Sequence, residues 1–198
     1  MLVFGISLGE TTLGEAETIL ASRAKRALFI MPPVEDELGE AVTPEHNIEA
    51  FFPNMPDNSK MLLGLATIEE EMAQIRHKAH NPIAFPSGNI KLKIADEHQK
   101  MVNGMAILTL TAIPRIKLSP EDIHNKFGEP VRVHVQDEIL HFLYPEIGLD
   151  AILDKSGEAM LQFVEPEKFA QVLQSLGLNQ DTLNTPQASP VSDGSEVQ

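Results

Sequence analysis

The sequence predicts an α+β fold of two small modules, each with capped helices packed on an antiparallel β-meander, followed by a disordered C-terminal tail. Three observations lead to this prediction. Strand-like alternation of apolar and polar residues recurs along the chain, helix-start signals precede amphipathic segments, and a pattern in the second half partly repeats one in the first. A chain of 198 residues, 42% of them hydrophobic, can bury the core of such a fold.

The first half is expected to open with a strand that leads into a helix. Residues 2–8 alternate like a strand, and Thr11 or Thr12 can cap the helix that follows, with Glu15 as the carboxylate of a capping box. Further elements are expected as strands over 48–52 and 61–66, a helix over 67–80 opened by Thr67 and Glu70, and an antiparallel pair formed by 90–94 and 105–113 across a turn.

The second half has the stronger pattern. Ser119 is a predicted N-cap, Pro120 occupies the first helical position, Asp122 lies three residues after the cap, and Gly128 ends the helix. A hairpin with a two-residue turn at Gln136-Asp137 would follow, which places Val133 opposite Leu140 and Arg132 opposite His141. The remaining predicted elements are strands over 149–153 and 159–164, a helix over 166–177, and a disordered tail over 179–198.

The two halves share short matches that favour a tandem repeat. Ile6, Leu8 and Leu13 have the spacing of Ile116, Leu118 and Ile123, and Phe51-Phe52-Pro53 resembles Leu143-Tyr144-Pro145. The offsets at the helix and at the strand differ, so the first copy would carry a longer helix-to-strand segment. The predicted boundaries are 1–88 for the first, degenerate module, 89–178 for the second, and 179–198 for the tail.

The stretches "IKLSPEDIHNKFGEP" and "HFLYPEIGLDAILDKSGEAMLQF" carry a family resemblance. Together they resemble the small α+β module shared by the SmpA/OmlA outer-membrane lipoproteins and the β-lactamase inhibitor protein, over residues 116–164. The resemblance implies a bacterial envelope or secreted protein that acts by binding another protein, and it implies no catalytic motif. The chain departs from the family in having no lipobox cysteine, so anchoring does not carry over.

Composition excludes several partners. The formal charge of −14, from 15 Lys and Arg against 29 Asp and Glu, repels nucleic-acid phosphates and anionic lipids. The chain has no cysteine, no apolar run of about 20 residues and no signal peptide as written. The resemblance therefore favours the periplasm or cell envelope, whereas a true start at Met1 favours the cytoplasm. The oligomeric state is left open.

Local patterns yield no catalytic, cofactor or metal site. His77 and His80 have helical spacing but no third ligand, and Glu69–Glu71 fits a solvated acidic helix start. The "GISLGETTLG" stretch has the wrong glycine spacing for a phosphate loop. The alternative to a binding protein is a hydrolase-like enzyme whose acids or histidines converge only in the fold.

One predicted sheet face is the candidate protein-binding surface. Its polar residues are either the ordinary solvent face of a sheet or, together with apolar neighbours, a recognition site. Ile152 and Met160 would share this face. The residues assigned to the surface are Arg132, His134, Ile139, His141 and Leu143.

Overall fold

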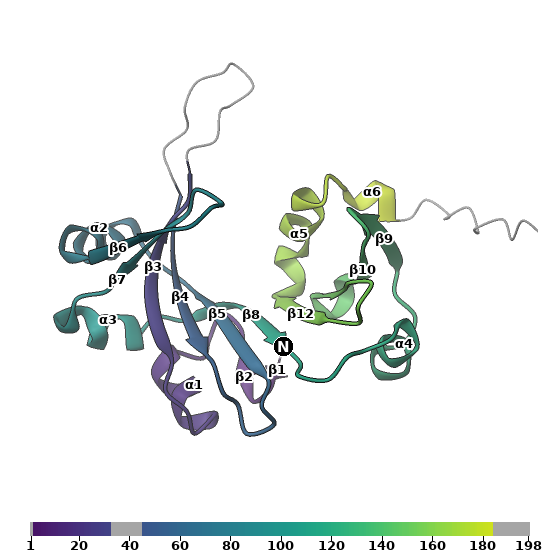
Figure 1. Ribbon diagram of the computed structural model, residues 1–198, viewed down its shortest axis with the longest axis horizontal. Helices are drawn as coiled ribbons and strands as arrows, with labels where there is room; N and C mark the ends of the chain where they lie inside the picture. Colours follow the sequence, from purple (N-terminus) through teal and green to yellow (C-terminus); the bar gives the residue numbers. More distant parts are fainter. Residues whose placement is uncertain (1, 33–44, 184–198) are drawn as a thin grey trace, which may run out of the picture.

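The chain has an α+β fold in which one large antiparallel sheet carries helices on both faces. The structure is a computed structural model that describes residues 2–32 and 45–183 (Figure 1). Ten strands form the sheet. Their spatial order is β6 (His80–Ala84), β7 (Ile90–Lys93), β3 (Lys25–Ile30), β4 (His46–Phe52), β5 (Lys60–Leu65), β8 (Ile107–Ile113), β12 (Ala159–Val164), β11 (Leu149–Leu153), β10 (Ile139–Tyr144) and β9 (Arg132–Gln136).

The remaining elements are short. A separate hairpin is formed by β1 (Leu2–Val3) and β2 (Ile6–Ser7). Three 3₁₀ turns span Asp96–His98, Pro145–Ile147 and Pro166–Lys168. The helices are α1 (Leu13–Ile19), α2 (Glu69–Lys78), α3 (Gln99–Asn103), α4 (Pro120–Phe127), α5 (Phe169–Ser175) and α6 (Gln180–Leu183).

The strand registers divide the side chains between two faces, which we name the inner and the outer face. Residues that share the inner face include Ile48, Leu63, Leu110, Phe142 and Leu161, and all are buried. This face packs against apolar side chains of α1, α2, α3 and α4 in one continuous core. Burial of large aliphatic and aromatic side chains along the whole sheet supplies most of the stabilisation of the fold.

The outer face is covered only in part. Helix α5 contributes Phe169, Val172 and Leu173 to a second, smaller core that also contains Leu143 and Val164 of the outer face. Strands β9–β12 therefore lie between two helices, with α4 on the inner side and α5 on the outer side (Figure 1). Among the described residues, neither hydrophobic cluster places a helix on the rest of the outer face.

Two of the three predicted helix caps are confirmed. The Thr12 hydroxyl accepts a hydrogen bond from the backbone of Glu15, whose carboxylate accepts one from the backbone of Thr12. Ser119 and Asp122 make the same reciprocal pair at the start of α4. These bonds satisfy backbone groups that would otherwise have no partner at a helix start.

Several expected elements are wrong in detail. Residues 2–8 form a hairpin rather than one strand, because Phe4 and Gly5 both have positive φ and reverse the chain. Helix α2 has Ile68 as its N-cap with no side-chain cap, so the predicted Thr67 box is absent. His80 lies in β6 and not on the helix of His77.

The predicted pairing of 90–94 with 105–113 is also wrong. Strand β7 pairs with β3 and β6, whereas β8 pairs with β5 and β12. The segment expected to be a turn between them forms a 3₁₀ turn and α3, which carries the chain across the inner face. Although β7 and β8 are consecutive strands in the sequence, β3, β4 and β5 therefore lie between them in the sheet.

The division into two modules stays a prediction. Residue 88 lies in the turn between β6 and β7, and β7 pairs with β3 of the first half. The predicted tail falls outside the described residues from 184 onward, while residues 180–183 form α6.

Candidate protein-binding surfaces

The structure brings four of the five predicted surface residues to the outer face in neighbouring positions, and it buries the fifth beneath a helix. The β9–β10 turn is Asp137-Glu138 rather than Gln136-Asp137, and both turn residues have positive φ. His134 therefore lies opposite His141, and Arg132 lies opposite Leu143. The change moves each partner by two positions, so every side chain keeps its predicted face.

Leu143 cannot contact a partner in this structure. It has no exposed surface and packs against α5 with Val164 and Leu173. The remaining apolar residues of the predicted face are less covered: Ile139 and Ile152 are half-buried, and Met160 is 42% exposed. We call Ile139, Ile152 and Met160, which lie on β10, β11 and β12, the outer apolar strip.

His141 is engaged inside the protein. Its Nδ1 atom lies 2.8 Å from Oδ2 of Asp150, and both side chains are buried. A carboxylate can only accept, so this nitrogen carries the proton and donates it. The second carboxylate oxygen of Asp150 is buried and has no hydrogen-bond partner among the described residues.

The surroundings of His134 disfavour protonation of its ring. Its pKa is lowered, first by partial burial and then by the neighbouring charges of His141 and Arg132, which outweigh the opposing effect of Asp150. The ring centroids of His134 and His141 are 6.3 Å apart. Arg132 is half-buried and takes part in an interaction within the protein. The polar part of the predicted surface is therefore largely occupied by contacts within the chain.

A second candidate surface was not expected from the sequence. On the inner face, a hollow of about 440 Å³ lies where the first half of the sheet meets the second. We call it the junction groove. Its lining includes residues of the β1–β2 turn, the β4–β5 loop, the β8–α4 connection and α4, namely Phe4, Asp57, Ser59, Pro114, Arg115, Ile116, Leu118, Asp122 and Lys126, above Ala112 and Leu161 of the sheet.

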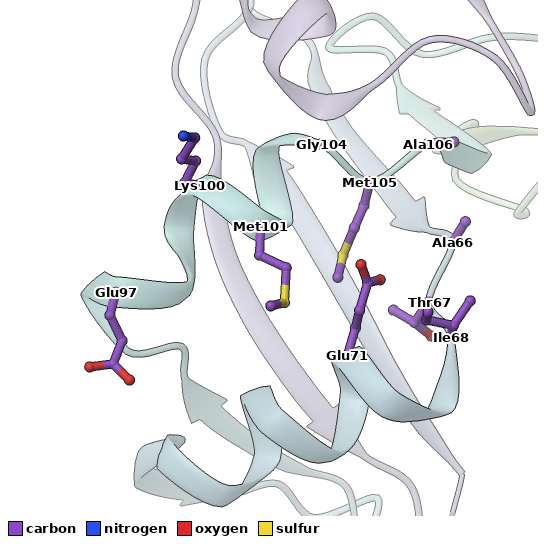
Figure 2. A pocket seen from close by; sticks show the side chains of 10 residues that line it. All are labelled: Ala66, Thr67, Ile68, Glu71, Glu97, Lys100, Met101, Gly104, Met105 and Ala106. Atoms are coloured by element: carbon purple, nitrogen blue, oxygen red, sulfur yellow. The ribbon is translucent and has the colours of Figure 1, made fainter.

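A third hollow, of about 670 Å³, lies between the start of α2 and the end of α3 (Figure 2). Met101 and Met105 point into it, and the carboxylate of Glu71 lies beside them, whereas Lys100 and Glu97 point away. Glu97 is instead paired with Lys78 at 2.5 Å. One half-exposed carboxylate beside two thioethers provides an apolar, weakly acidic recess but no acid–base pair.

No described cavity combines two buried acids or histidines. The buried pair His141 and Asp150 lines neither the junction groove nor the hollow between α2 and α3. Within residues 2–32 and 45–183, His, Asp and Glu side chains do not gather in the groups of three that would hold a metal ion. None of the helices in the same ranges has the length and hydrophobicity needed to cross a bilayer.

Comparison with known proteins yields no match among family models, curated proteins or solved structures. The SmpA/OmlA resemblance, which covers residues 116–164 well and residues 6–66 loosely, therefore rests on the sequence alone and stays a prediction.

The junction groove has a sequence signal that reasoning from alternation missed. Phe4-Gly5 lies between apolar pairs, Leu2-Val3 and Ile6, and a two-residue connection of this kind makes a tight hairpin when both residues adopt positive φ. Because Phe is rare in that conformation, alternation over residues 2–8 favoured a continuous strand instead.

Proposed function

We propose that this chain is a non-enzymatic, envelope-type protein built from two α+β modules, which binds another protein through the uncovered part of its outer sheet face. The observation that carries the proposal is the outer apolar strip, with Met160 42% exposed beside Ile139 and Ile152. Apolar residues grouped on a sheet face and rimmed by polar ones mark recognition sites.

The strand order supports the two-module architecture. Strands β3, β4, β5 and β8 approach the centre of the sheet from one side in chain order, and β9, β10, β11 and β12 approach it from the other. A capped helix precedes each set, α1 before β3 and α4 before β9. In the first set, α2, β6, β7 and α3 are inserted between β5 and β8, and no described helix or strand lies at the corresponding place between β11 and β12.

Charge on the outer face indicates the chemistry of the partner. The chain carries a net charge of −14, yet the charged strand residues on this face are mostly cationic. The basic ones are Lys25, Lys60, Lys91, Lys93 and Arg132, against Glu49 and Asp150. We therefore expect the partner to be a folded protein that presents an apolar patch with a carboxylate rim, since complementary charge steers association.

The experiment is site-specific photo-crosslinking in the full chain. A benzophenone amino acid replaces Met160 in one variant and Ala73, which is exposed on α2, in the control. We expect one protein to be crosslinked through position 160 and not through position 73. That protein, once purified, should bind the wild type at least about tenfold more tightly than Met160→Glu, as a charge placed in an apolar contact predicts.

Equal crosslinking at both positions, or unchanged affinity of a folded Met160→Glu variant, would contradict the proposal. The hydrolase alternative is favoured by a different result. If His141→Asn and Asp150→Asn both fold and a turnover activity found in the wild type is lost in both, the buried pair belongs to an active site.

A further inference from the structure

The junction groove lies on the opposite face from the outer apolar strip, and large apolar side chains are exposed along it. Phe4 is 51% exposed and Ile116 is 70% exposed, and both line the groove. Beneath them, Ala112 and Leu161 form a buried apolar floor. The groove therefore has an apolar base with two large apolar side chains on its rim.

Phe4 is held in a costly backbone conformation. It and Gly5 are the two central residues of the β1–β2 turn, with φ of 53° and 80°. Turns of this kind favour Asn, Asp or Gly at the first position, and a bulky residue there is strained. The strain is not repaid by burial, because the ring is half exposed. Strain kept at an exposed apolar residue is typical of a binding site.

The acidic side chains of the groove already accept hydrogen bonds within the chain, whereas its basic side chains form no ion pair with a described residue. The carboxylate of Asp57 accepts hydrogen bonds from the backbone and hydroxyl of Ser59, and that of Asp122 accepts the equivalent pair from Ser119. These bonds lower the pKa of both carboxyls. Both acids are therefore ionised and have part of their hydrogen-bonding capacity in use.

The cations have no such partners. Arg115 and Lys126 form no ion pair with any residue of the described ranges, and the Nζ atom of Lys126 lies 5.6 Å from the ring centroid of Phe127. Lys60 and Lys117 line a neighbouring hollow that shares Arg115 and Ile116 with the groove. A ligand carboxylate would thus find donors without an ion-pair partner, whereas a ligand cation would find carboxylates that already accept hydrogen bonds.

We propose that the junction groove binds an acidic amphipathic segment of a partner protein. A large apolar side chain of the segment packs between Phe4 and Ile116, and Asp or Glu residues on either side of it pair with Arg115 and Lys126. This site is separate from the outer apolar strip, and its occupant is defined by charge as well as by apolar surface.

The test uses the full chain and three fluorescein-labelled short peptides. Each has a Phe-Leu centre, flanked on both sides by Glu, by Gln or by Lys, and binding is measured by fluorescence polarisation. The Glu peptide should bind at least about tenfold more tightly than the Lys peptide at low ionic strength, and the difference should shrink as salt is added. The double variant Arg115→Glu/Lys126→Glu should reverse the order of the peptides.

Two variants separate binding from folding. Phe4→Asn suits the turn better, so it should raise the midpoint of thermal unfolding while weakening binding of the Glu peptide. Lys100→Glu, an exposed charge reversal on α3 outside the groove, should leave the binding order unchanged.

Two outcomes overturn the proposal. One is equal binding of the three peptides, or tightest binding of the Lys peptide, by the wild type. The other is concentration-dependent dimerisation in sedimentation that Phe4→Asn abolishes while no peptide binds, which would make a second copy of the chain the occupant.

Discussion

The pair formed by His141 and Asp150 shows how a polar contact is kept inside a sheet–helix interface. Both residues alternate onto the outer face, yet both are buried. Burial of a carboxylate is costly unless it is paired and hydrogen-bonded, and the 2.8 Å contact supplies one such bond. The unpaired second oxygen of Asp150 means that the compensation is incomplete.

His134 makes the stability of the fold depend on pH. Its pKa is lowered in the folded chain, mainly by burial and then by the charges of His141 and Arg132. Below the ordinary histidine value of about 6.5 the unfolded chain therefore binds more protons than the folded one. The contribution of His134 to stability is present above that pH and is lost as the pH falls through the folded pKa.

We expect His134→Gln to lose less stability than the wild type between pH 8 and pH 5, as measured by urea unfolding at a series of pH values. His77→Gln, an exposed position on α2, is the control. The assignment fails if both variants and the wild type lose stability equally, or if a direct NMR titration places the pKa of His134 above the ordinary value.

For single residues, alternation in the sequence correctly predicted which side chains share a face of the sheet. It did not predict which of them a helix covers. Arg132, His134, Ile139 and His141 share the outer face as expected. Leu143 has the same alternation and is nevertheless buried, because α5 returns over that part of the sheet. Period-two patterning states which residues point together, and it contains no information about a helix that packs on them later in the chain.

Among the secondary-structure elements, those with complete local signals were predicted best. Helices α1 and α4 begin at their predicted caps because the capping residues bond within four positions of one another. The β9–β10 turn was displaced by one residue, since Asp137 and Glu138 adopt positive φ without a glycine to mark the position. A two-residue turn without Gly or Asn has little sequence signal.

Two glycines have similar backbone conformations but different surroundings. Comparing an alanine substitution at each separates the cost of the conformation from the cost of a steric clash. Gly148 has φ of 59° and follows the 3₁₀ turn after β10, and Gly177 has φ of 67° and follows α5. A Cβ added at Gly148 would lie 2.0 Å from the carbonyl oxygen of Val164, whereas one added at Gly177 meets nothing within 4 Å. Only the first substitution would force the backbone of β12 away from β11.

We expect Gly177→Ala to lower the free energy of unfolding by about 1 kcal/mol, the cost of the left-handed conformation alone. Gly148→Ala should lower it by about 3 kcal/mol or more, because the backbone clash adds to that cost. Urea denaturation followed by circular dichroism measures both. If both variants lose the same free energy of unfolding, β12 can shift to accommodate the added methyl group and the predicted clash is absent.

The whole molecule is organised around the pairing of β8 with β5 on one side and β12 on the other. Every strand of the large sheet is thereby linked through continuous hydrogen bonding, and the inner core extends under both halves. Losing one half would expose both the edge of β8 and part of the shared core. The two halves should therefore unfold together.

Coincident unfolding can be measured with one probe in each half. Tyr144, the only tyrosine, reports on the second half, and Phe29→Trp adds the only tryptophan to the first. We expect both signals to give one midpoint in urea, and we expect Leu63→Ala to lower both midpoints equally. Separate midpoints would indicate that the halves are independent folding units.

The order of the strands could not have been read from the sequence. Alternation predicted most strands, yet β7 and β8 were paired with each other because they are neighbours in the chain. Strand β7 pairs with β3, and β8 pairs with β5 and β12, most of which lie far from them in the sequence. Residues 96–103, which connect β7 to β8, form a 3₁₀ turn and a helix and so separate the two strands. The junction groove depends on the same long-range arrangement, and only its Phe4-Gly5 turn had a signal in the sequence.

The central position of β8 has a consequence for biosynthesis. Its first partner, β5, leaves the ribosome before it, whereas its second partner, β12, is made only after the whole of α4 and the β9–β11 meander. During that interval, one edge of β8 has unpaired backbone N–H and C=O groups. These groups can pair with a strand of another nascent chain. The topology therefore predicts that the nascent chain is most prone to aggregate in the interval between the synthesis of β8 and that of β12.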